Sequence, residues 1–136
     1  MLIINKLQKL IYNQLANSNK ENIKKLKNIV STSIINSDFP YLIIDINNLE
    51  IDKNFANDYY IVNIKIKIFD KNESNSNIIN ISSDIFMELS DLNNIYINNA
   101  RIIDINLLNT ELNLFNEINS IWSCNLNFKI TIENII

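Results

Sequence analysis

The stretch SIWSCNLNFKITIE, residues 120–133, alternates apolar and polar side chains almost without a break. A period of two residues is that of an extended strand with one buried and one solvated face. The same period recurs in YIVNIKIKIF, residues 60–69, where Val62, Ile64 and Ile66 share one face and Lys65 and Lys67 lie on the other. Two such strands predict a sheet with an apolar layer packed against one of its faces.

Two further segments have the helical period. Residues 2–16 carry apolar side chains at steps of three and four, which predicts an amphipathic helix. Residues 78–92 repeat this pattern, with Ser74 to Ser76 as candidate N-caps. Between the two, Ile23, Leu26 and Val30 indicate a short helical stretch, although IVSTSII, residues 29–35, fits a first short strand equally well.

The remaining segments complete the sheet. The apolar run 41–46 predicts a strand buried on both faces, residues 47–58 a polar hairpin connection, and residues 101–108 a loosely alternating strand. No repeat or linker divides the chain. We therefore predict one α+β domain over residues 1–136, with a mostly antiparallel sheet packed against an N-terminal and a central helix.

The composition is biased in a way that points to the genome and not to the fold. The chain holds 28 Asn and 30 Ile but no glycine or histidine, as strong A+T pressure in a low-GC genome would produce. Disorder is the rival interpretation of so many Asn residues. It fails because 47% of the residues are hydrophobic and are spread at regular periods.

The absent residue types exclude most enzyme classes. Without histidine there is no imidazole base or metal ligand, and without glycine no phosphate-binding loop. The single cysteine, Cys124, lies in an apolar stripe, which favours a buried thiol over a nucleophile. The N-terminus lacks a signal-peptide cleavage site, and no apolar run is long enough to span a membrane. We predict a non-enzyme with no cofactor or metal, made in a reducing bacterial cytoplasm.

Charge is unevenly distributed along the chain. Residues 1–27 hold six lysines against Glu21, whereas residues 70–117 hold Lys71 and Arg101 against eight carboxylates. Two solvated faces are one interpretation, and complementary surfaces that meet between copies of the protein are the other. Binding to nucleic acid is poorly supported, because the net charge is −3 and the lysines are not interleaved with aromatic residues.

Asp84, Glu88 and Asp91 share one face of the central helix by spacing. They are the best candidates for metal ligands or an acid–base pair in this chain. With no histidine to join them, a solvated helix face is the favoured interpretation.

Five segments in a fixed order carry a resemblance to a known family. They are LQKLIYNQL (7–15), FPYLIID (39–45), VNIKIKIFDKNESN (62–75), IINISSDIFMELSDL (78–92) and IWSCNLNFKITIE (121–133). In this order they resemble the small tail terminator (tail completion) proteins of long-tailed bacteriophages and gene transfer agents. Relatives usually have glycine where this chain has Asp45 and in the break before the central helix. Asn and Asp tolerate positive φ best after glycine, so these departures are physically reasonable.

The resemblance implies a structural role. Such proteins form a ring, typically a hexamer, on the head-proximal end of the virion tail. The ring stops polymerisation of the tail tube protein, presents the docking surface for the head–tail connector protein, and lets DNA pass through its lumen without specific binding. A neutral or acidic lumen suits that role. A head–tail connector or adaptor of a phage or prophage, or an unrelated small binding module, is the alternative function.

The sequence also nominates residues for contacts between subunits or with the tube. Phe39 and Tyr41 flank Pro40, the only proline, which fixes how the chain enters its strand. Charged residues from the basic and acidic segments and from the polar face of the strand at residues 60–69 complete the set. The candidates are Lys20, Lys24, Lys25, Phe39, Tyr41, Lys65, Lys67, Asp70, Arg101 and Asp104.

Overall fold

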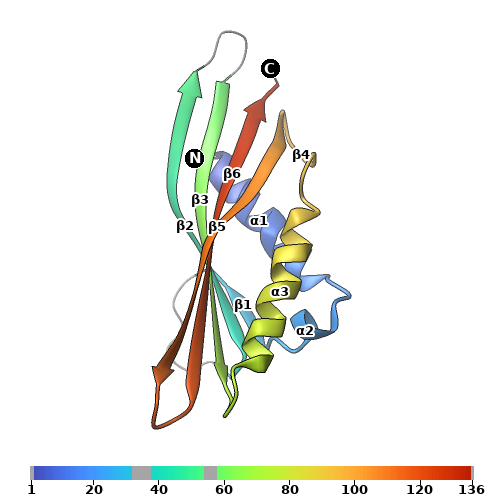
Figure 1. The fold of residues 1–136 in the computed structure, drawn as a ribbon. Coiled ribbons are helices and arrows are strands. Elements are labelled where there is room, and N and C mark those ends of the chain that lie inside the picture. Colours follow the sequence, from blue (N-terminus) through green and yellow to red (C-terminus); the bar gives the residue numbers. More distant parts are fainter. Residues whose placement is uncertain (1, 32–37, 54–57, 136) are drawn as a thin grey trace.

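The computed structural model describes residues 2–31, 38–53 and 58–135. Its elements run in the order α1 (Leu2–Ala16), α2 (Glu21–Lys24), β1 (Asn28–Val30), β2 (Tyr41–Lys53), β3 (Asp58–Lys71), α3 (Ser76–Ser90), β4 (Tyr96–Ile97), β5 (Ala100–Asn116) and β6 (Ile121–Asn134). Figure 1 follows this order from blue to red. The predicted α+β class is confirmed.

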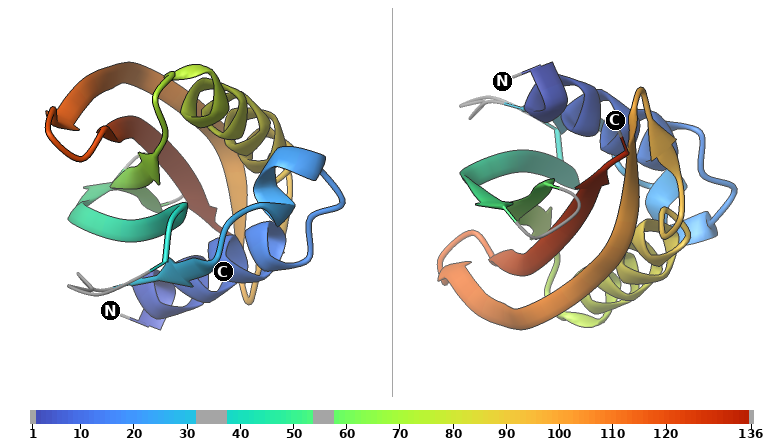
Figure 2. Two further views of the ribbon diagram at one scale, coloured as in Figure 1. Left: turned by 90° about the horizontal axis from the view of Figure 1, so that it is seen from below. Right: turned by 90° about the horizontal axis from the view of Figure 1, so that it is seen from above.

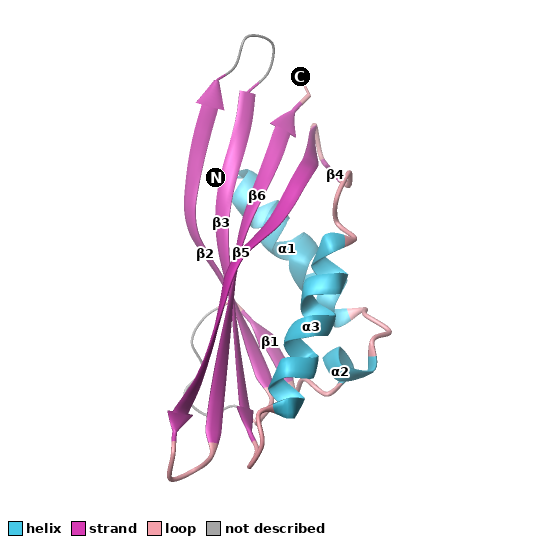
Figure 3. Cartoon of the chain, in the orientation of Figure 1, coloured by secondary structure: helices cyan, strands magenta, loops and turns pink. Residues whose placement is uncertain are grey.

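One twisted sheet organises the molecule. Its strand order is β1-β2-β3-β6-β5-β4, and every neighbouring pair is antiparallel except β1 with β2. Helices α1 and α3 lie together on one face of this sheet, and within the described residues the other face carries no helix (Figures 1 and 3). The mostly antiparallel sheet with two helices against it is therefore as the sequence predicts.

The buried core lies between the helices and the sheet. The alternating residues of β3 and β6 pair across the strands, so that Ile64 stands opposite Phe128 and Ile66 opposite Leu126. Leu7 and Ile11 of α1 pack against these residues from the helix side and are fully buried. Each such aliphatic side chain contributes about 1.5–3 kcal/mol by leaving water. The apolar faces of the strands, with a period of two, and of the helices, with a period of three to four, thus pack together in one core.

Two strands are longer than predicted. Residues 47–53 belong to β2, so the hairpin connection predicted at 47–58 is wrong over that part, and residues 54–57 lie outside the described residues. Strand β5 has 17 residues in place of the predicted 101–108. Both extensions pair in register with the strongly alternating strands β3 and β6. Cross-strand pairing outweighs the weak strand propensity of Asn-rich segments.

The segment between the helices resolves an ambiguity. Helix α2 is a single turn, and Asn28–Val30 form strand β1, so the strand interpretation holds for these residues. Residues 32–35 of the predicted 29–35 segment lie outside the described residues. The Lys27 amide donates to the Pro40 carbonyl over 2.7 Å, which places the start of β1 beside that of β2. Strand β4 was not predicted, because two residues carry no periodic signal.

Turns without glycine use asparagine and serine. Among the described residues, positive φ occurs at Asn94 (68°), Asn98 (57°) and Ser120 (54°). Asn is the best substitute for glycine there, because its short polar side chain tolerates the left-handed region. Asp45 is not among these residues and pairs regularly with Lys65 inside β2. That departure from the resembled family therefore needs no glycine-like backbone.

The start of α3 differs in detail from the prediction. Its N-cap is Asn75, inside the predicted segment 74–76, but the Asn75 side chain makes no capping hydrogen bond. The Ser74 hydroxyl instead accepts a hydrogen bond from the Ser76 amide over 3.0 Å. This is a local serine turn that leads into the helix.

Candidate assembly surfaces

The helix-free face of the sheet carries charges of both signs. By register, Asp45 stands opposite Lys65, and Arg101 stands opposite Glu133. The Lys67 ammonium also lies 3.9 Å from the Asp45 carboxylate, with both side chains partly exposed. A surface of alternating signs sets up little net field. The charges on this face are therefore nearly balanced, and five of the predicted contact residues lie on it by register: Tyr41, Lys65, Lys67, Arg101 and Asp104.

Aromatic rings cross one end of the same face. Tyr41 contacts Phe39 at a centroid distance of 5.4 Å and stacks on Phe69 at 5.1 Å, and Phe69 meets Phe115 edge-on at 5.7 Å. Such pairs contribute about 0.5–1.5 kcal/mol beyond burial. Burial raises the pKa of the Tyr41 hydroxyl. Phe39 and Tyr41 are thus already engaged within the protomer, and their role between subunits stays a prediction.

The lysine-rich and acidic segments meet within one protomer. The Glu88 carboxylate of α3 accepts hydrogen bonds from Gln14 Nε2 (2.9 Å) and Ser18 Oγ (3.1 Å), and the Lys20 ammonium lies 3.8 Å away. Asn22 Nδ2 donates to Asp84 over 3.0 Å in the same way. These carboxylates tie α3 to the α1–α2 segment. The solvated-face interpretation is therefore wrong for Asp84 and Glu88.

The interpretation of Asp84, Glu88 and Asp91 as metal ligands or an acid–base pair gains no support. Asp91, which follows α3, is exposed, whereas Asp84 and Glu88 are half-buried. Within residues 2–31, 38–53 and 58–135, no three acidic or cysteine side chains are grouped as metal ligands would be.

Two more predicted contact residues lie at the α2–α3 boundary. Lys24 is exposed on α2. The exposed Lys25 Nζ donates to Asn22 Oδ1 over 3.1 Å and to Asn77 Oδ1 over 3.3 Å. Both lysines belong to the helical layer and not to the helix-free face. The structure therefore distributes the predicted contact residues over two separate surfaces.

Asp70 does not belong on either surface. Its side chain is only 3% exposed, and its carboxylate accepts a hydrogen bond from Asn77 Nδ2 over 2.9 Å. The two-residue period of β3 places the Asp70 side chain on the helix side of the sheet, opposite Trp122 of β6. The sequence placed it among the contact residues from charge alone, and burial within the protomer corrects this.

Arg101 and Asp104 stand near the start of β5. The Arg101 side chain is partly buried, and its Nε has no hydrogen-bond partner among the described residues. Asn106 Nδ2 donates to the Asp104 carboxylate over 2.6 Å.

Sequence reasoning missed the most exposed apolar surface. The far half of the β5–β6 hairpin, residues 108–120, projects beyond the helices (Figures 1 and 2) and is called the hairpin arm below. Ile118 at its tip is 93% exposed and Phe115 is 67% exposed. Leu108, Leu112 and Leu114 are also exposed. The signal was present in the sequence, because apolar residues continue there beyond the predicted strand 101–108.

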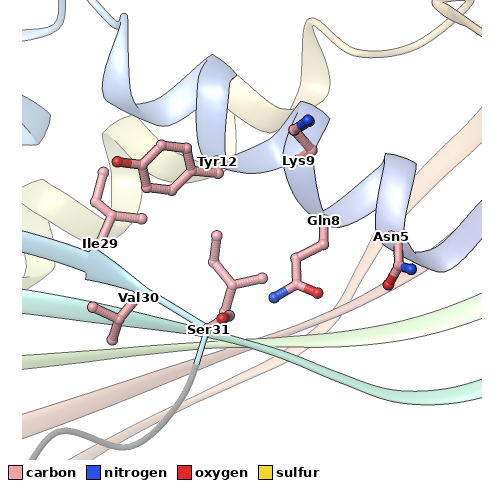
Figure 4. A pocket seen from close by; sticks show the side chains of 8 residues that line it. Asn5, Gln8, Lys9, Tyr12, Ile29, Val30 and Ser31 are labelled. Atoms are coloured by element: carbon pink, nitrogen blue, oxygen red, sulfur yellow. The ribbon is translucent and has the colours of Figure 1, made fainter.

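A groove lies on the opposite side of the molecule, between α1 and β1. It encloses about 480 Å³ and is lined by Asn5, Gln8, Lys9, Tyr12, Ile29, Val30, Ser31 and Ile44. Figure 4 shows Tyr12 and Gln8 projecting from α1 toward Ile29 and Ser31. The floor is apolar, and Lys9 stands at the rim. We call this the α1–β1 groove.

Cys124 behaves as a packing residue. Its thiol is buried on the helix side of β6. Burial raises the pKa of the thiol, and a hydrogen bond with Ser82 opposes this in part. A protonated, buried thiol is a poor nucleophile, as the sequence predicts.

Comparisons with known proteins identify a fold but no family. No family model and no curated protein matches the sequence. Among solved structures, a chain from the virion of a native gene transfer agent (GTA) particle matches with a TM-score of 0.73. The match covers 90% of this chain and 91% of that chain at 9% sequence identity. None of the described helices is long and apolar enough to cross a membrane. Over nine tenths of its length, the chain has the fold of a chain from that virion.

Proposed function

We propose that this protein is a structural virion component that caps the head-proximal end of a phage-type tail tube as a closed ring. The single observation that carries this is the shared fold with a gene transfer agent virion chain over nine tenths of both chains. The ordered motifs that resemble tail terminators point in the same direction. The protein acts by binding and not by catalysis.

The sheet has the open edges that a ring needs. Among the described residues, β5 has no strand on its outer side from Ile103 to Asn116, and β2 has none from Ile44 to Lys53. The two edges lie at opposite ends of the strand order. Contacts between opposite ends of identical subunits are heterologous, and they close into a ring when the rotation permits. Six copies form the ring in this proposal.

The helix-free face is the natural lining for the lumen of such a ring. Its charges alternate in sign, as Asp45 with Lys65 and Arg101 with Glu133 illustrate. DNA bound to a basic surface gains affinity from each phosphate contact. A nearly neutral lining avoids that affinity, so DNA passes without specific binding while α1 and α3 face outward.

The oligomeric state tests the proposal. One chain has a mass of 15.9 kDa, so six copies have about 95 kDa. Light scattering after size exclusion should give a discrete species of ring mass. A monomer that also fails to cap tail tubes would favour the alternative function, a head–tail adaptor.

Charge reversal maps the subunit contacts. The exposed Lys24 and Lys25 are predicted to contribute to the ring, so Lys24→Glu with Lys25→Glu should weaken it most at low salt, where charges are least screened. Lys129→Glu is the control, a charge reversal on the helix-free face at a residue outside the predicted contact set. Unchanged assembly of the double variant at low salt would remove α2 from the interface.

A further inference from the structure

We propose that the hairpin arm of one copy inserts into the α1–β1 groove of the next copy. This deepens the proposed function, on which it rests, because it names the two surfaces that close the ring. The occupant of the groove is thus a second copy of this chain.

The arm has the properties of a segment that is covered in the assembled state. It bears five exposed apolar side chains, and its outer strand edge is unpaired among the described residues. Proteins normally blunt such edges with lysine, proline or a covering element. Residues 102–128 contain neither lysine nor proline. An apolar, unprotected edge is stable against non-specific association only when a defined partner covers it.

The groove offers a matching surface. Tyr12, Ile29 and Ile44 line it with apolar side chains, and Tyr12 is 45% exposed in the single chain. A volume of about 480 Å³ lies within the range of sites that hold a small molecule. It is therefore large enough for the branched side chain at the arm tip, Ile118.

Charge selects this pairing. The arm carries Glu111 and Glu117 without a lysine or arginine. Lys9 lies at the groove, and the exposed Lys27 directly precedes β1. Charges of opposite sign orient such a docking and favour it over arm-to-arm contact.

The geometry favours a ring over a closed dimer. The arm extends from β5, near one end of the strand order, and the groove adjoins β1 at the other end. In Figure 2 (left) the β5–β6 turn lies at the upper left, and β1 and α1 lie along the lower edge. An arm therefore reaches the groove of a neighbouring copy and leaves its own groove free for the next, which is a heterologous contact.

Disulfide trapping between two variants tests the contact. Ile118→Cys and Tyr12→Cys are made in separate chains that carry tags of different size, mixed, and oxidised. Both positions are exposed, so neither change disturbs the core. We expect a mixed disulfide dimer as the main product. Ile118→Cys mixed with Asn80→Cys, which is exposed on α3, is the matched control and should give less than a tenth of it.

The outcomes separate this inference from the proposed function. A ring-sized species that gives no cross-link between positions 118 and 12 above the control would overturn the arm-to-groove contact and leave the ring intact. A chain that stays monomeric alone and on tail tubes would overturn both. As a second readout, Ile118→Asp should raise the concentration for half-assembly at least tenfold while the circular dichroism spectrum stays unchanged. Assembly unaffected by this substitution would also contradict the inference.

Discussion

Replacing Glu88 by alanine tests how the helical layer is held together. The substitution removes two hydrogen bonds to a carboxylate whose side chain is only 13% exposed. Each such bond contributes about 1.5–3 kcal/mol, but Gln14 and Ser18 regain some water when the carboxylate is gone. The Lys20 ion pair adds about 0–1 kcal/mol. Two smaller effects oppose this loss: alanine has a higher helix propensity than glutamate, and the substitution removes a negative charge near the C-terminus of α3. Each stabilises the helix by a few tenths of a kcal/mol. The free energy of unfolding should therefore fall by about 2 kcal/mol.

Urea unfolding followed by circular dichroism measures this loss directly. A 136-residue chain loses roughly 3–5 °C of melting temperature per kcal/mol, so a parallel thermal scan should fall by about 6–10 °C. Glu88→Gln keeps an acceptor and should cost about half as much. Asp91→Ala removes an exposed carboxylate and should stay within about 0.5 kcal/mol of the parent. A Glu88→Ala change as small as that of Asp91→Ala would refute the proposed tie between α3 and α1.

Three further predictions concern the core. Phe128→Ala should lower the free energy of unfolding by about 3–5 kcal/mol, because it leaves a cavity where a ring that is 1% exposed now packs, and urea unfolding measures this. Asn77→Ala should lower the free energy of unfolding by about 1–3 kcal/mol, because it leaves the buried Asp70 carboxylate without this hydrogen-bond donor. Asn80→Ala, at an exposed position, should change the midpoint of urea unfolding little. Cys124 should resist a thiol reagent until urea unfolds the chain. Because burial raises the pKa of this thiol, the unfolded state loses its proton first, so stability should fall as the pH rises through the alkaline range.

The strands and helices were predictable wherever one periodic pattern was uninterrupted. The alternation through Leu126 and Phe128 and the steps from Ile78 to Leu89 both correspond to elements in the structure. The ends of β2 and β5 were not predictable, because Asn-rich segments there extend only by pairing with β3 and β6. Pairing is a long-range property that a local pattern does not contain.

The assembly surfaces were less predictable than the fold. Charge placed Asp70 on a surface, but the strand period turns it into the protein beside Asn77. Lys20 and Glu88 belong to the basic and acidic segments, which the sequence left open as solvated faces or as surfaces that meet between copies. In the structure the two residues meet within one chain, because α3 packs on the α1–α2 segment. The sequence shows apolar residues beyond position 108, but only the structure shows that the helices do not cover them, so that Ile118 stays exposed.

Electron cryo-microscopy of tail tubes polymerised with and without this protein tests the proposed cap most directly. We predict a ring of density on one end of each tube and no further elongation from that end once the protein is added. Tubes that grow at the same rate, with bare ends at every protein concentration, would contradict the proposed function.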